Sequence, residues 1–364
     1  MGEESGMSNP LAHLCVMRAF QSGSAMSIGR KRRSTGRVTL ADVAQLAGVG
    51  TMTVSRALRT PEQVSDKLRE KIEAAVSELG YLPNLAASSL ASASSYTIAM
   101  VVPSFSESGC ADMFAGLQRV LQPAGYQIML AESQHHIERE ETLLETLLSY
   151  NLAAAVLLSV EHSENTRQAL TTANIPVVEI GAMRTDPIDI NIGIDYVAAM
   201  YQLTQTVINS GYQNVGLMCA NQEQWIFQQH LQGWHKALLH HHMSPHRVIN
   251  AAQPASFSTG AQQLPEFLLA WPELDALVCA SDELACGALY ECQRRRIKVP
   301  DQLAIVGFGN SEFSQVCQPP LTTMTVPHKE IGIQAGKALL ARLNGQEWQL
   351  EGSIPSTLCR RSSC

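Results

Sequence analysis

The chain lacks any long hydrophobic run. Its longest apolar stretches, such as residues 152–158, fall far short of the roughly 20 residues that cross a bilayer, and each predicts a buried strand. Residues 11–20 are mildly apolar, but they follow two acidic residues and lead to no clear cleavage site. We therefore expect neither a membrane span nor a secretory signal peptide.

Paired cysteines are also missing. None of the nine cysteines forms a Cys-x-x-Cys pair, the spacing that zinc and redox sites commonly use. An odd number of cysteines in a chain with no predicted secretion signal indicates reduced thiols, mostly in the core. The sequence thus predicts a cytoplasmic protein without a cysteine-based metal site.

Motifs for nucleotide binding and nucleophilic catalysis are absent as well. The chain has no Walker phosphate loop, no nucleophile elbow and no complete G-x-G-x-x-G opening a helix. Gly307 and Gly309 alone are better explained as a strand-to-loop turn. We expect no enzyme activity and no cofactor.

Two groups of polar residues could nevertheless form a metal site or a catalytic site. The histidines cluster at residues 240–242, with His235 and His246 nearby, but no cysteine or carboxylate pattern supports a metal site, and solvated histidines are favoured. Glu179 and Asp195 resemble a catalytic carboxylate pair. Both are predicted at strand ends of one lobe, where holding a ligand is favoured over catalysis.

Length and charge favour a small head on a larger body. A chain of 364 residues is too long for one typical core and predicts two or three domains. Residues 30–96 carry ten Lys/Arg against six Asp/Glu, whereas residues 97–364 carry fifteen against twenty-five. A basic head on an acidic body indicates that only the head contacts phosphates.

Residues 38–58, reading VTLADVAQLAGVGTMTVSRAL, are the most informative stretch. Thr39 and Asp42 have the spacing of a capping box at a first helix, and Gly48 permits a tight turn. A second helix is predicted to begin near Thr51, with the geometry of a recognition helix in a DNA major groove. The expected core positions of this helix pair are Val43, Leu46, Val54 and Leu58.

A third helix is predicted over residues 65–79, with Gly80 at its left-handed C-terminal cap. The continuation, GYLPNLAASSLASASSYTIAMVVPS, resembles the LacI/GalR family of bacterial transcription regulators when taken with the helix-turn-helix. In that family a Tyr-x-Pro-Asn stretch opens a hinge helix whose leucine wedges into the minor groove. The resemblance therefore assigns DNA contacts to Asn84 and Leu90.

The body alternates short apolar strands with helical segments, which predicts parallel sheets covered on both faces. One series runs from about residue 96, and a second begins near residue 195. Two doubly wound lobes result, with a ligand cleft at the carboxyl ends of their strands. The resemblance implies the same architecture, a periplasmic-binding-protein-like effector domain.

The resemblance extends from residue 38 to about residue 343. Strings such as SDELACGAL (281–289) and KVPDQLAIVGF (298–308) strengthen it. MTVSRALRTPEQVS (52–65), PVVEI (176–180) and YECQRRRIKVPD (290–301) are most similar to the gluconate repressor branch. The expected divisions are a tail over 1–37, a DNA-binding domain over 38–83, a hinge over 84–96 and the effector domain over 97–364.

Within the head, Thr51, Met52 and Arg56 are predicted to read base edges, with Arg56 suited to guanine and Met52 to a thymine methyl. Thr53 and Ser55 are expected to contact phosphates or the helix backbone. Thr39 completes the predicted DNA-contacting set. Gly50 departs from the serine or threonine usual in the family, which removes a helix cap.

Within the cleft, the resemblance implies ligand-binding roles for several polar and aromatic residues: Ser104, Phe105, Phe114, Glu179, Asp195, His230, Ser281, Asp282 and His328. A helix cap is the alternative for Asp282, and core packing is the alternative for the aromatics. Gly309 stands where the family commonly has an aspartate that grips sugar hydroxyls. Its absence, with His230 and His328 as donors or cations, points to a sugar acid.

The sequence as a whole predicts a cytoplasmic, homodimeric repressor that binds a palindromic operator and a small effector, most simply gluconate or a related aldonate. A regulator answering to another sugar, a phosphorylated metabolite or a partner protein stays open. A two-lobed solute-binding module of the periplasmic type would lack residues 38–90 and carry a signal peptide. A sugar-processing enzyme would need motifs that the chain does not display.

Overall fold

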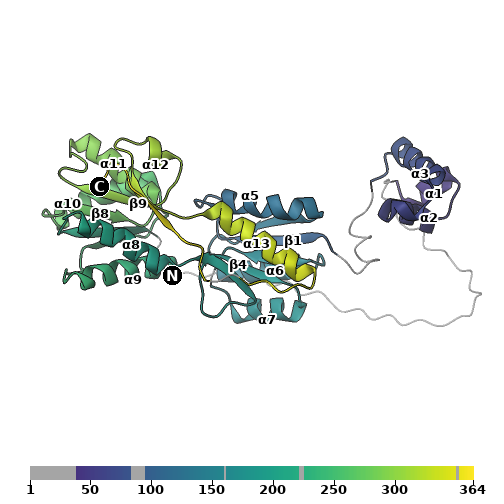
Figure 1. Ribbon diagram of the computed structural model, residues 1–364, viewed down its shortest axis with the longest axis horizontal. Helices are drawn as coiled ribbons and strands as arrows, with labels where there is room; N and C mark the ends of the chain where they lie inside the picture. The colour runs from purple at the N-terminus through teal and green to yellow at the C-terminus, as the bar shows by residue number, and fades with distance from the viewer. Residues whose placement is uncertain (1–37, 83–94, 160, 221–224, 350–351) are drawn as a thin grey trace, which may run out of the picture. The chain divides into compact units, whose positions relative to one another are not determined.

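The computed structural model describes residues 38–82, 95–159, 161–220, 225–349 and 352–364, and it divides the chain into two compact units, residues 1–84 and 85–364 (Figure 1). We call the described part of the first unit the head and the described part of the second unit the body. The predicted tail and the hinge residues Asn84 and Leu90 lie outside the described residues.

The head is built from three helices and one short 3-10 turn: α1 (Leu40–Ala47), α2 (Thr51–Arg59), η1 (Pro61–Gln63) and α3 (Asp66–Leu79). The predicted capping box is confirmed, because Thr39 and Asp42 satisfy each other's backbone N–H groups. Gly48 (φ 61°) and Gly80 (φ 60°) adopt the left-handed conformation that glycine enters at little cost. The helix-turn-helix prediction is therefore confirmed.

The core of the head comes from all three helices. Val43, Val54 and Ile72 are at most 1% exposed and belong to one cluster, and Leu58 packs at its edge. The predicted core position of Leu46 was wrong, since its side chain is 44% exposed. The face of α1 that packs inward carries Val43, Ala44 and Ala47, and Leu46 lies outside that stripe.

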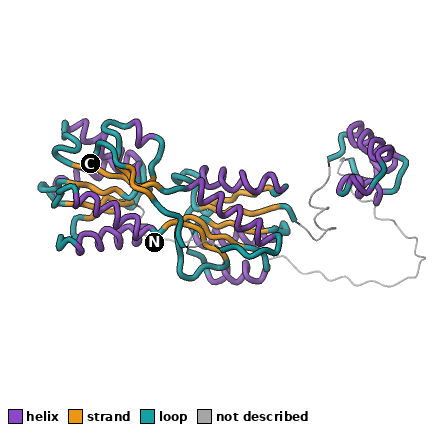
Figure 2. Tube along the Cα trace, in the orientation of Figure 1, coloured by secondary structure: helices purple, strands orange, loops and turns teal. Residues whose placement is uncertain are grey.

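The first lobe of the body is a five-stranded parallel sheet in the order β2-β1-β3-β4-β5. Figure 2 shows the strands of the body, in orange, with helices packed around them. The strands are β1 (Thr97–Val102), β2 (Gln127–Glu132), β3 (Ala154–Leu157), β4 (Val177–Ala182) and β5 (Ile190–Ile194). The helical segments between them are α5 (Cys110–Leu121), η2 (Gln122–Ala124), α6 (Ile137–Leu148) and α7 (Glu164–Ala173). Because both faces are covered, β1, β3 and β4 are apolar throughout, apart from Thr97 at the start of β1 and Glu179 in β4.

The second lobe is a six-stranded sheet in the order β11-β10-β9-β8-β6-β7, parallel except for the edge strand β11. Its strands are β6 (Val215–Ala220), β7 (Val248–Ala251), β8 (Ala276–Cys279), β9 (Ala304–Gly309), β10 (Thr322–Thr325) and β11 (Thr357–Cys359). Its helices are α8 (Tyr196–Asn209), α9 (Trp225–His240), α10 (Phe257–Ala270), α11 (Asp282–Arg295) and α12 (Phe313–Val316). The prediction of two doubly wound lobes is confirmed.

The lobes are not consecutive in sequence, which the sequence analysis did not foresee. After β10 the chain returns to the first lobe as α13 (His328–Leu343), which packs against α5 and β4, and then re-enters the second lobe as β11. Small residues allow this return. A Cβ on Gly332 would lie 2.0 Å from the Met113 carbonyl oxygen, so α5 and α13 are in backbone contact there.

Of the helices that the structure describes, none is long and apolar enough to cross a membrane. The strands β5, β10 and β11 were not predicted. Each has only three to five residues, and a short apolar or polar run of that length carries little periodic signal.

Candidate DNA-binding and ligand-binding sites

The recognition helix α2 exposes the side chains predicted to read bases. Met52 is 78% exposed, and Thr51 and Arg56 are also exposed, while Thr53 and Ser55 are half-buried. Gly50 provides no side-chain cap at the start of the helix, as its departure from the family pattern predicted. Thr39 has a structural role, because its hydroxyl donates a hydrogen bond of 2.7 Å to Asp42 within the capping box of α1. The DNA-contact assignments stay predictions.

The carboxyl ends of the strands in both lobes bring a second group of residues together. We call this group the interlobe site; it consists of Glu107, Ser108, Gly109, Tyr196, His230, Phe308, Ser311 and His328. Ser108 follows β1 and Ser311 follows β9, and their hydroxyl oxygens are 3.4 Å apart. The two loops therefore meet at hydrogen-bonding distance, as parallel α/β lobes with facing strand ends require.

Asp282 supports the second-lobe half of this site from beneath. Its side chain is fully buried and accepts hydrogen bonds from the Ser311 N–H and the Thr323 hydroxyl, each 2.6 Å long. Burial raises the pKa of Asp282 to about 6, although these hydrogen bonds act to lower it. Ser281 caps α11 by accepting from the Leu284 N–H at 3.3 Å. Both predicted ligand residues thus have structural partners in the described chain.

An aromatic group forms the next part of the site. Tyr196 stacks on Phe308 with 5.7 Å between ring centroids, and the His230 ring meets both edge-on at 5.3 and 4.9 Å. His230 is 5% exposed, and burial lowers its pKa to about 3, so its ring is neutral. Among the described residues its Nε2 has no hydrogen-bond partner. An unpaired buried polar atom typically costs about 1–3 kcal/mol, so this nitrogen would gain from a hydrogen bond.

His328 begins α13 and fills the space beside Gly109. A Cβ on Gly109 would lie 2.3 Å from the His328 ring, so the backbone and the imidazole are in direct contact. Burial lowers the pKa of His328 to about 4, with a small opposing effect of Asp112. Like His230, it offers neutral hydrogen-bonding nitrogens. The sequence argument that these histidines provide positive charge is therefore weakened.

The remaining predicted ligand residues of the β1 loop and α5 differ in exposure. Phe105 is 48% exposed, and its N–H donates to Glu132 at 3.0 Å. The hydroxyl oxygens of Ser104 and Ser106 are 2.8 Å apart. Phe114 instead packs against the core cluster of the lobe, which agrees with its alternative assignment as a core residue.

Glu179 was expected at a strand end but is the third residue of β4, so that placement was wrong. Its fully buried side chain lies 3.4 Å from Nε2 of His162, whose Nδ1 lies 2.5 Å from Glu140. Its other carboxylate oxygen accepts the Ile188 N–H at 2.6 Å. This placement within the sheet, next to α6, speaks against a direct ligand contact.

Asp195 and the histidine cluster also have structural roles. Asp195 is exposed and caps α8 by accepting the Ala198 N–H at 2.9 Å. His240 ends α9, and its Nδ1 is 2.8 Å from the Tyr201 hydroxyl. Within the described ranges no three His, Cys, Asp or Glu side chains converge in a way that could hold a metal ion.

Of the interlobe-site residues, only His230 and His328 were predicted as ligand residues, and Glu107 is the one carboxyl group among those that were missed. It lies in the loop after β1, and its Oε1 is 3.2 Å from Nε2 of His135. Burial raises its pKa to about 7. Gly309 was predicted to favour an acidic ligand because a carboxylate at that position would repel it, but Glu107 places a carboxyl group elsewhere in the site. Its position in the loop that follows a buried strand, in the string SESG, was the available signal.

Comparisons with known proteins agree with a DNA-binding head and a two-lobed body. Residues 39–84 match the family described as bacterial regulatory proteins, lacI family, and residues 204–364 match the periplasmic binding protein-like domain. The HTH-type transcriptional regulator GntR of Escherichia coli K12 is 38% identical over 311 residues, which cover 85% of this chain and 93% of that protein.

Two solved structures show the same architecture. A LacI-family transcriptional regulator from Silicibacter pomeroyi aligns with a TM-score of 0.83 at 29% identity, covering 90% of this chain and 99% of that one. The lac repressor dimer bound to operator and an anti-inducer aligns with a TM-score of 0.78 at 26% identity, with the same coverage. This chain therefore belongs to the lacI family of bacterial regulatory proteins and is a DNA-binding transcriptional regulator.

Proposed function

We propose that this protein is a cytoplasmic repressor that binds a palindromic operator as a homodimer and releases it when a sugar acid, most simply gluconate, occupies the interlobe site. The exposed face of α2 supports the operator contact, since Met52 and Arg56 have the reach and chemistry to read base edges. The solved lac repressor dimer on operator supports the two-headed arrangement.

The unpaired Nε2 of His230 is the observation that carries the effector proposal. The ring of His230 is buried against Tyr196 and Phe308, so its Nε2 is shielded from water. A hydroxyl group of a bound ligand would give this nitrogen a hydrogen-bond partner. The aromatic rings offer an apolar surface for the carbon face of a sugar derivative. The resemblance of several segments to the gluconate repressor branch supports the choice of an aldonate.

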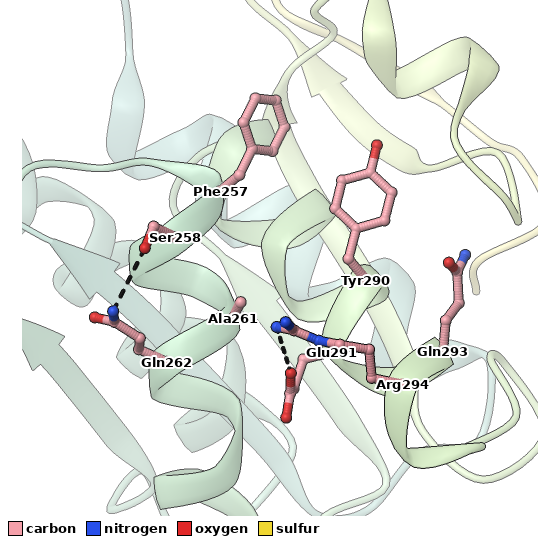
Figure 3. Close-up of a pocket in the computed structure, with 8 residues that line it drawn as sticks. All are labelled: Phe257, Ser258, Ala261, Gln262, Tyr290, Glu291, Gln293 and Arg294. Carbon is pink, nitrogen blue, oxygen red and sulfur yellow. Dashed lines mark hydrogen bonds and ion pairs between the residues drawn. The ribbon is translucent and has the colours of Figure 1, made fainter.

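An exposed apolar face on the second lobe supports self-association. Phe257 on α10 and Tyr290 on α11 are 41% and 45% exposed, and Figure 3 shows their rings on adjacent helices beside a surface groove. Phe313 lies 4.9 Å from Phe257 between ring centroids, and Val316 on the same short helix is 80% exposed. A palindromic operator needs two heads and therefore two copies of the chain. We assign the contact between the two copies to this face, because exposed apolar side chains that lie together typically mark an interaction surface.

Calorimetry with the full chain tests the effector, and footprinting tests the operator. Gluconate should bind, and it should release a footprinted palindromic operator. The double substitution His230→Gln with His328→Gln should abolish gluconate binding while leaving operator affinity unchanged without ligand. Exposed His246→Gln is the matched control and should bind gluconate normally. Failure of every sugar acid to bind at about millimolar concentration would refute the effector assignment but not DNA binding.

A further inference from the structure

Glu107 is the one carboxyl group of the interlobe site that a small ligand can reach. Its side chain is 38% exposed, while Asp282 beneath the second-lobe loop is fully buried. Its charge also raises the pKa of Tyr196, in addition to the larger effect of burial, which places it near the aromatic group. Among the described residues, no hydrogen bond ends on its second oxygen, Oε2.

His135 holds the first oxygen of Glu107 in place. Gln134 and His135 both have positive φ values, 55° and 62°, an unusual pair of left-handed residues that turns the chain sharply after β2. Although Nε2 of His135 lies 3.2 Å from Oε1 of Glu107, burial lowers the pKa of His135 and raises that of Glu107. Burial therefore favours the neutral form of each group, and attraction between opposite charges is weakened in this contact.

Among the described residues, the charged groups that act on Cys110 and His328 in this part of the site are acidic. On the same side as Glu107 lie Glu132 at the end of β2, the Cys110 thiol of α5 and Asp112, which acts on His328. From the second lobe, Arg361 approaches the loop of Ser311, but its guanidinium donates to Asn310, Ser314 and Leu321. Asp195 and Lys329, at the starts of α8 and α13, are exposed. An anion entering here would meet carboxyl groups and neutral rings.

We propose that Glu107 receives the carboxylate of the effector as a carboxylic acid, so that binding of a sugar acid takes up a proton. The neutral Glu107 would donate its Oε2 proton to the ligand carboxylate while His135 steadies Oε1. An ionised Glu107 would repel the ligand. This inference rests on the proposed function, since it names how the charge of that effector is accommodated.

The sign of the pH dependence follows from the free and bound forms. In the free protein the pKa of Glu107 is about 7, and a ligand carboxylate beside it raises that pKa further because two like charges repel. Below about pH 7 the acid is already present, so affinity is flat. Above it, affinity falls by up to about tenfold per pH unit, until the pKa of the bound form is passed.

The experiment is titration calorimetry of the full chain with gluconate at pH about 6, 7 and 8, repeated in buffers of different ionisation enthalpy. The wild-type dissociation constant should rise about tenfold between pH 6 and 8, about fivefold of it between pH 7 and 8, with uptake of close to one proton at pH 8. Glu107→Gln, which copies the neutral acid, should bind with less than about twofold pH dependence and more tightly than wild type at pH 8. Glu145→Gln, an exposed carboxyl group on α6, should keep the wild-type slope.

Three results would count against the inference. A flat wild-type profile, or a slope that persists in Glu107→Gln, means that Glu107 does not carry the proton. If wild type binds gluconate at no pH, the proposed function fails and this inference fails with it.

Discussion

Replacing His162 should remove a pH-dependent part of the stability of the body. His162 lies in the loop between β3 and α7 with its side chain fully buried, and both ring nitrogens face carboxylates, Glu140 at 2.5 Å and Glu179 at 3.4 Å. The second contact is an ion pair without the alignment of a hydrogen bond. A buried imidazolium between two carboxylates costs much to leave unpaired, and its removal typically costs about 3–5 kcal/mol.

The pKa of His162 gives the pH window. Burial opposes the charged ring, but the hydrogen bond with Glu140 and the charges of Glu140 and Glu179 outweigh it and raise the pKa from 6.5 to about 9. Because the folded pKa lies above the unfolded value, the stabilisation is fully present below pH 6.5 and is lost as the pH rises to about 9. A shift of that size corresponds to about 3 kcal/mol.

The assay is thermal unfolding of the full chain, followed by circular dichroism at pH about 6 and 9.5. For a body of this size, about 3 kcal/mol corresponds to a fall in Tm of roughly 6–12 °C. At the lower pH, His162→Gln should have a Tm well below that of wild type. Between the two pH values its Tm should change little, because the variant has no imidazolium to lose. His246→Gln, an exposed histidine, should follow wild type.

Equal pH profiles for wild type and His162→Gln would refute the argument, since the difference between them isolates the buried imidazolium. A variant as stable as wild type at low pH would also refute it, because two buried carboxylates would then have lost their shared partner without cost.

Three further predictions concern other parts of the chain. Arg56→Ala should weaken operator binding by about 1–3 kcal/mol and relax the preference at one base pair, measured by binding to a set of single-base operator variants; uniform weakening across all of them would instead indicate a phosphate contact. Gly332→Ala should destabilise the first lobe by more than about 3 kcal/mol in denaturant unfolding, because its Cβ would lie 2.0 Å from the Met113 carbonyl oxygen, and an unchanged midpoint would contradict the backbone contact. Tyr290→Lys with Phe257→Asp should convert the dimer to monomer in light scattering at about micromolar concentration, whereas Leu269→Asp, at the other end of α10, should leave it dimeric; a persistent dimer in the first variant would exclude this face.

The sequence by itself determined the features that depend on neighbours a few residues away. The capping box of Thr39 and Asp42, the left-handed turn at Gly48 and the alternation of apolar strands with helices were all predicted, and all are present. Each is a local choice, because caps, turns and periodic stripes are set by spacings of a few residues. The same local signals carried the resemblance to the family.

Only the tertiary structure decided which distant side chains meet. Glu107 faces His135 and Tyr196, and His230 meets Phe308, because parallel strands far apart in the chain end at one edge. The placement of Glu179 within the sheet was missed for the same reason, since the partner that makes a buried carboxylate tolerable, His162, is supplied by another loop. Periodicity shows which face of an element is buried, but pairing, burial of charge and the return of α13 to the first lobe depend on contacts that no local pattern specifies.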